Sequence, residues 1–168
     1  NKNESYARVI LLAKDDQGYL NLLKLSSKSY LETPSDDLPH ISMNDLKQYN
    51  EGLIMLTGSH YGPVNRLVIS KKPDDAEILL LKFKNIFTDR LYIELTRTGV
   101  EAEQLAEEAM INLAYKHDIA LVATNDVYFA GREIHEAHDA LMCVASGRYT
   151  SENERPKVSQ ECYFKTPR

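Results

Sequence analysis

Short apolar runs alternate with longer amphipathic stretches along the chain. The short runs are almost uninterrupted, which is typical of strands covered on both faces in a parallel sheet. We therefore expect buried strands at residues 9–13, 52–57, 91–95 and 119–124. The longer stretches repeat their apolar residues at helical spacing. They predict helices at residues 17–31, 42–49, 73–87, 102–117 and 131–144.

Alternating strands and helices are typical of an α/β fold in which helices pack against parallel strands. The order fits either part of a β/α barrel or an open doubly wound sheet. In both architectures, functional side chains lie in the loops that follow the carboxyl ends of the strands. Those loops are residues 14–16, 57–62, 96–99 and 125–129.

Composition narrows the function classes. The 168 residues include 20 basic and 25 acidic side chains, a net charge of -5, which disfavours a domain that grips nucleic acid by itself. No apolar run approaches the ~18 residues that span a membrane, and two cysteines cannot form a disulfide framework. We expect a cytoplasmic protein with no membrane partner. The start at Asn1 without methionine and the end at Arg168 indicate a piece of a longer protein.

The histidines and cysteines give weak signals. His135 and His138 are three residues apart on a predicted helix, whereas the zinc-protease helix needs histidines four apart, so a solvated charged face is favoured. His117, in the last turn of its helix, complements the negative end of the helix dipole. Cys143 lies in an apolar helix and is predicted to be a core residue.

The loops after the predicted strands hold two further candidates. Asn125–Asp126 ends a strand and presents a carboxylate where a metal ligand would stand, although this pair also forms ordinary turns. Ser59 and His60 are adjacent, but neighbours in a loop usually point apart, which disfavours a nucleophile and its base. The spacing of Gly58 and Gly62 lacks the Lys-Ser/Thr pair of a phosphate-binding loop.

Several segments together resemble the PHP (polymerase and histidinol phosphatase) domain of bacterial DNA polymerase III alpha subunits. The segments occur in the family's order and cover nearly the whole chain. They are residues 9–25, 51–58, 89–99, 120–129, 136–147 and 162–168. The resemblance implies that residues 1–147 belong to a distorted, TIM-like β/α barrel that lacks its first strands and their metal motifs. It also implies that residues 148–168 are an irregular connector toward the polymerase core.

The resemblance places five positions at the family's metal pocket. Where metal-binding members carry histidine or cysteine, this chain has Arg8, Ser59, Thr98 and Tyr128, and only Asp126 keeps a ligand type. Arginine carries a permanent charge and has no acceptor, so it repels cations rather than binding them. We therefore expect a vestigial pocket with no metal, no cofactor and no catalytic residue in this segment, and an ion pair between Arg8 and Asp126.

By resemblance, the whole protein is a replicative DNA-directed DNA polymerase that uses magnesium held outside this segment. Its implied partners are the proofreading exonuclease, other replicase subunits and DNA, the last through the rest of the protein. This segment would then be a scaffold and a docking surface for the exonuclease. One alternative is an active metal-dependent phosphoesterase or 3'-5' exonuclease with most ligands upstream of residue 1. Another is a fragment of an unrelated α/β enzyme.

Overall fold

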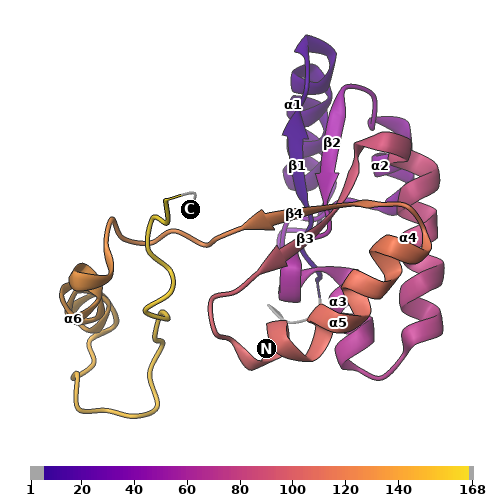
Figure 1. Ribbon diagram of the computed structural model, residues 1–168. Helices are drawn as coiled ribbons and strands as arrows, with labels where there is room; N and C mark the ends of the chain where they lie inside the picture. The colour runs from indigo at the N-terminus through magenta and orange to yellow at the C-terminus, as the bar shows by residue number, and fades with distance from the viewer. Residues whose placement is uncertain (1–5, 167–168) are drawn as a thin grey trace.

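A four-stranded sheet forms the centre of the molecule (Figure 1). The structure is a computed structural model that describes residues 6–166. The strands, in their order across the sheet, are β1 (Ile10–Ala13), β2 (Leu53–Leu56), β3 (Leu91–Thr96) and β4 (Ala120–Thr124). All four lie within or beside the predicted runs, so the apolar pattern located the strands correctly.

The direction of β1 differs from the prediction. β2, β3 and β4 are parallel, but β1 is antiparallel to β2, with Ala13 opposite Leu53. The chain leaves β1 through one helix and returns through a long loop and a second helix, so it enters β2 beside the point where β1 ended. A backbone hydrogen bond from Lys14 N–H to the Gly52 carbonyl, 2.8 Å long, fixes that junction. The expectation of parallel strands throughout is therefore wrong for β1.

Six α-helices are present in the described part of the chain. They are α1 (Asp16–Leu31), α2 (Met43–Gln48), α3 (Pro63–Ile69), α4 (Pro73–Phe87), α5 (Glu101–Lys116) and α6 (His135–Ser146). The Ser42–Asp45 capping box that starts α2 is formed on both sides. Helix α3 was not predicted, although Pro63 at its first helical position is a common start signal.

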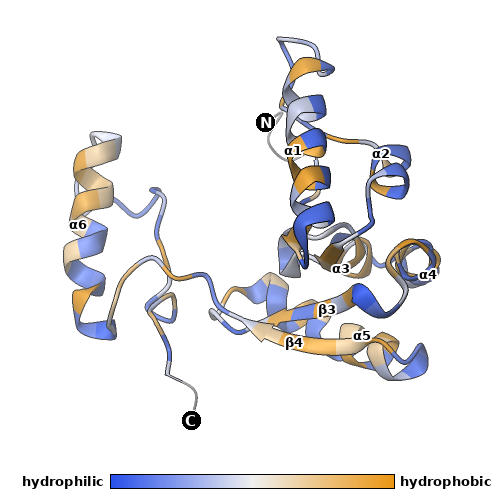
Figure 2. Cartoon of the chain, turned by 90° about the horizontal axis from the view of Figure 1, so that it is seen from above, coloured by the Kyte–Doolittle hydropathy of each residue, from blue (hydrophilic) through white to orange (hydrophobic). Residues whose placement is uncertain are grey.

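The core lies between the sheet and helices α1, α4 and α5, which pack on neighbouring strands. Its largest fully buried side chains are Phe87, Leu53, Met55, Leu80, Ile93, Met110 and Val64. Figure 2 shows hydrophobic segments along the labelled strands and helices. The outer strands differ from the prediction of full burial. Ile10 and Leu12 of the edge strand β1 are 40% and 47% exposed, and these two alternate residues point to the same face of the sheet.

Helix α6 lies apart from the sheet (Figure 1). The predicted helix at 131–144 begins later, at His135, because residues 132–134 form a 3-10 turn. Cys143 is buried inside this part of the molecule, which confirms its predicted core position. Residues 158–165 then run back toward the sheet, where Phe129 and Tyr163 form a parallel bridge. We call residues 158–165 the C-terminal strap.

Within residues 6–166, no helix is both long enough and apolar enough to cross a membrane.

Helix α4 offers a matched test of the core. Leu80 is fully buried, whereas Ile78, two residues away, is 53% exposed. Leu80→Ala should lower the free energy of unfolding by about 2–5 kcal/mol, through lost burial and the cavity left behind. Ile78→Ala should change it by less than about 0.5 kcal/mol, as for most surface substitutions. Urea unfolding of both variants measures the difference, and equal losses would contradict this placement of the core.

Candidate functional site

A buried polar cluster joins the carboxyl ends of β2 and β3 to the start of α5. The Glu103 carboxylate accepts hydrogen bonds from the hydroxyls of Thr96 (2.6 Å) and Thr98 (2.8 Å) and from the Thr98 backbone N–H (2.8 Å). The hydroxyl of Ser59, in the turn after β2, bonds that of Thr96. All four residues are buried. Neutral hydroxyl and amide donors therefore surround the one carboxylate of this cluster.

Hydrogen bonding decides the ionisation of Glu103. Burial raises the pKa of the Glu103 carboxyl, but the hydrogen bonds from Thr96 and Thr98 outweigh it and leave the pKa below its usual value. His60 adds a small effect in the same direction, with its Nδ1 3.6 Å from the carboxylate. The folded protein therefore holds Glu103 as a buried anion with its oxygens already occupied.

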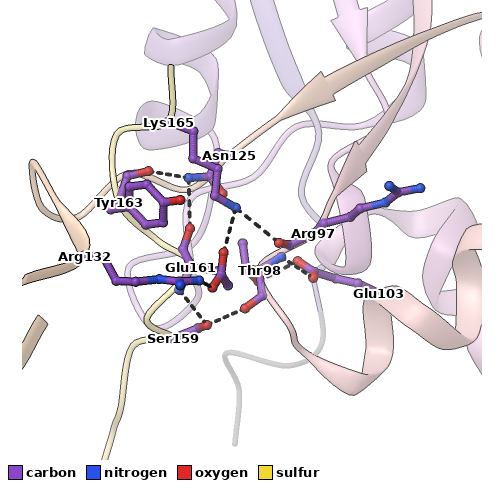
Figure 3. A network of polar contacts seen from close by, with 9 residues as sticks. All are labelled: Arg97, Thr98, Glu103, Asn125, Arg132, Ser159, Glu161, Tyr163 and Lys165. Carbon is purple, nitrogen blue, oxygen red and sulfur yellow. Dashed lines mark hydrogen bonds and ion pairs between the residues drawn. The ribbon is translucent and has the colours of Figure 1, made fainter. Parts of the chain in front are cut away.

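The C-terminal strap lies across the loops that follow β3 and β4 (Figure 3). The Ser159 hydroxyl donates to the Thr98 carbonyl. The side-chain amide of Asn125 donates to the backbone carbonyls of Glu161 (3.2 Å) and Tyr163 (2.8 Å). The strap thus connects residues just after two strands of the sheet, where the sequence analysis placed the functional loops.

Charged side chains hold the outer side of the strap (Figure 3). Arg132 pairs with Glu161, and its guanidinium lies 5.7 Å from the centre of the Tyr163 ring. Lys165 lies 5.5 Å from the same ring and also pairs with Glu161. Exposed ion pairs contribute little each, so the backbone bridges and the Asn125 bonds do most of the positioning.

Of the predicted metal-pocket residues, Ser59 and Thr98 belong to the Glu103 cluster, whereas Arg8, Asp126 and Tyr128 do not. Arg8 is exposed and lies 5.2 Å from the centre of the Tyr61 ring. Asp126 and Tyr128 are also exposed, and Tyr128 makes an edge contact with His138. Arg8 and Asp126, both within the described residues, form no ion pair, so that prediction is wrong. The guanidinium of Arg8 lies over the Tyr61 ring instead.

The residues at these positions do not fit a metal ion. A site needs three to four donors, yet the Ser59 and Thr98 hydroxyls are neutral and engaged in the Glu103 cluster. Among residues 6–166, no group of three or more His, Cys, Asp or Glu side chains is arranged to hold a metal. The absence of metal from the protein in solution remains a prediction.

The interpretation of His135 and His138 needs correction. His135 and His138 are not on a solvated face, because both rings pack against Phe129 and His135 bonds the Val158 carbonyl at 2.8 Å. His117 lies at the end of α5, as expected, and its Nε2 also bonds Glu77 of α4 at 2.7 Å. In both cases the side chain contacts a residue that is distant in sequence, and the local sequence pattern alone does not predict such a contact.

The Ser59–His60 pair does not form a nucleophile and base. The Ser59 hydroxyl bonds Thr96, while the His60 ring packs on Tyr61 with centres 3.9 Å apart. Glu103 is not among the site residues predicted from the sequence. A usable signal existed, since an acid in the first turn of a helix is placed to bond N–H groups of the preceding loop.

Comparison with known proteins places this geometry in a family. The model of the PHP domain matches residues 1–98, more than half of the chain. The chain belongs to the PHP domain family. It is similar over 96% of its length to two proteins named DNA polymerase III subunit alpha, with 41% identity in Caulobacter vibrioides and 40% in Rickettsia bellii. The protein of the same name in Haemophilus influenzae is 33% identical. The chain spans about 14% of the length of these relatives.

Replacing the buried carboxylate of this PHP chain tests the cluster. Glu103→Gln removes one acceptor oxygen and leaves a Thr98 donor unpaired, so it should cost about 1–3 kcal/mol of folding free energy at neutral pH. The matched control is Glu101→Gln, an exposed residue of the same helical turn, which should cost about 0.3–1 kcal/mol through the helix dipole.

The pH dependence of the folding stability tests whether Glu103 is ionised in the folded protein. Because the folded-state pKa of Glu103 is lowered, its stabilisation is complete above the unfolded-state pKa and is lost as the pH falls through the folded-state pKa. The stability difference between wild type and Glu103→Gln should therefore narrow on acidification, as followed by urea unfolding across acidic pH. A difference that stays constant or widens would contradict a buried ionised Glu103.

Proposed function

We propose that this chain is the PHP segment of a cytoplasmic replicative DNA polymerase of the DNA polymerase III alpha type. Similarity over nearly the whole chain to proteins of that name supports the proposal. The complete protein adds deoxynucleotides to a primer with magnesium held by carboxylates outside this segment. With a net charge of -5, the segment itself is poorly suited to contacting DNA phosphates, which the rest of the protein would bind.

We further propose that the sheet is one part of a distorted β/α barrel. Three parallel strands joined by helices support this architecture, as does the apolar character of the two edges. Exposed apolar edge strands are liable to pair with other chains, so native proteins usually cover them. Ile10 and Leu12 on β1 and Leu121 on β4 are 37–47% exposed. Further strands that pair at these edges would cover them.

Within the polymerase, we propose that this segment is a metal-free scaffold without chemistry of its own. The observation that carries this proposal is the Glu103 cluster. The hydroxyls of Thr96 and Thr98 and a backbone amide occupy the carboxylate that could otherwise coordinate a cation. The strap, bonded to the Thr98 carbonyl, further reduces access to the strand ends.

A scaffold of this kind needs a surface for its partner, which we propose is the proofreading exonuclease. Helix α1 offers apolar side chains that are about half exposed or more, and they follow helical spacing. These residues are Tyr19, Leu20, Leu23, Tyr30 and Leu31. Figure 2 shows the apolar bands along this helix. Contiguous exposed apolar surface on a folded protein usually marks an interaction site.

The proposal of a metal-free segment predicts the metal content of the purified protein. Protein purified without chelator should contain well below one equivalent of zinc, manganese or magnesium, because the pocket positions lack a set of three to four donors. Elemental analysis measures this content, and a nuclease assay with added manganese tests for activity. Asp126→Asn should leave both results unchanged, since Asp126 is exposed and lies outside the Glu103 cluster. About one metal per chain, or metal-dependent DNA hydrolysis, would favour the active phosphoesterase instead.

The docking proposal predicts a local loss of binding. In the complete alpha-type subunit, Leu23→Asp together with Leu31→Asp should weaken binding of the cognate exonuclease by about tenfold or more, because interface centres tolerate charges poorly. The control is Leu105→Asp, which is 62% exposed on α5 and should bind as wild type does. Surface plasmon resonance measures the dissociation constants. Unchanged binding of the α1 variant would rule out this surface.

A further inference from the structure

A small cavity lies beside the Glu103 cluster, between β3, α3 and α5. Its volume is about 10 Å³, close to the minimum that holds one water molecule. The lining includes Asn65 of α3, Glu94 and Thr96 of β3, and Glu103 of α5. The cavity is therefore polar, and only one small molecule or ion could enter it.

Two of the lining residues carry buried oxygens without a hydrogen-bond partner in the protein. Asn65 is 4% exposed, and its Oδ1 accepts no hydrogen bond. Glu94 is 3% exposed, and its Oε2 is likewise unpaired, although its Oε1 accepts from the Thr124 hydroxyl at 2.6 Å. Buried acceptors of this kind are rare in folded proteins, and water commonly satisfies them.

The neighbouring hydroxyls cannot supply the missing donors. The Thr96 and Thr98 hydroxyls both donate to Glu103. Because the Thr96 proton is used in this way, the Ser59 hydroxyl is the donor in the Ser59–Thr96 bond. The cavity thus offers two free acceptors and no free hydroxyl proton from these three residues.

We propose that one ordered water molecule occupies this cavity, donating one hydrogen bond to Asn65 Oδ1 and the other to Glu94 Oε2. A water molecule has two protons, which match the two unpaired acceptors. A cation would require more oxygens than remain free, since Glu103 is engaged by threonines and Glu107 by Arg97. The water joins α3, which follows the Ser59 turn, to the centre of β3.

A crystal structure of the chain, at a resolution that shows ordered water, tests the proposal directly. We expect one peak with contacts of about 2.7–3.2 Å to Asn65 Oδ1 and Glu94 Oε2. An empty cavity would overturn the proposal. A metal-bound peak, with shorter contacts to several oxygens or an anomalous signal, would also overturn it.

A double-mutant cycle gives an independent measurement in solution. Asn65→Leu keeps the side-chain shape but removes one acceptor, and Glu94→Gln changes the other. If one water links the two residues, the folding equilibrium constants should show a coupling of at least about twofold. The control pair, Glu94→Gln with Asn112→Leu on the exposed surface of α5, should be additive. Additivity of the Asn65 pair would overturn a bridging water. If either variant does not fold, the crystal structure decides alone.

Discussion

The buried carboxylate of Glu103 is the interaction on which the arrangement of the strand ends depends. It ties Thr96 at the end of β3 and Thr98 in the next loop to the first turn of α5. Ser59 extends the same network to the turn after β2, and the Thr98 carbonyl extends it to the strap. A buried anion is costly unless donors surround it, so each of these segments is held where its donor is needed.

Neutral hydrogen-bond donors and metal ions can both stabilise buried carboxylates, but they do so in different ways. A metal cluster neutralises several carboxylates with concentrated positive charge and leaves open positions for substrate. Here hydroxyls and an amide stabilise a single carboxylate, and the His60 ring lies 3.6 Å away. Such a network is rigid and closed, which suits a structural junction better than a reaction centre. The chemistry of the donors therefore supports the scaffold proposal from within the fold.

Local pattern accounted for much of the fold. Apolar runs located all four strands, and capping chemistry at Ser42 located α2. The direction of β1 could not be predicted in this way, because it depends on the path of the chain through α1 and α2 rather than on the strand's own residues. Burial of the edge strands was overestimated for a related reason. An apolar run shows that a strand suits cover on both faces, but not which part of the protein supplies the cover.

The candidate site was predicted less completely, and the reason lies in the difference between residue type and placement. The ligand-type substitutions at Ser59 and Thr98 identified two residues that belong to the Glu103 cluster, whereas Arg8 and Asp126 do not pair. Ser59 and Thr98 follow adjacent parallel strands, whose carboxyl ends the sheet brings together. Arg8 also lies at this edge, because β1 is antiparallel and its start pairs with the end of β2, but its side chain lies over the Tyr61 ring. Asp126 begins a segment that leaves the sheet toward α6. The orientation of the side chains and the path of the chain after β4, rather than strand direction, therefore decide which vestigial positions belong to the Glu103 cluster.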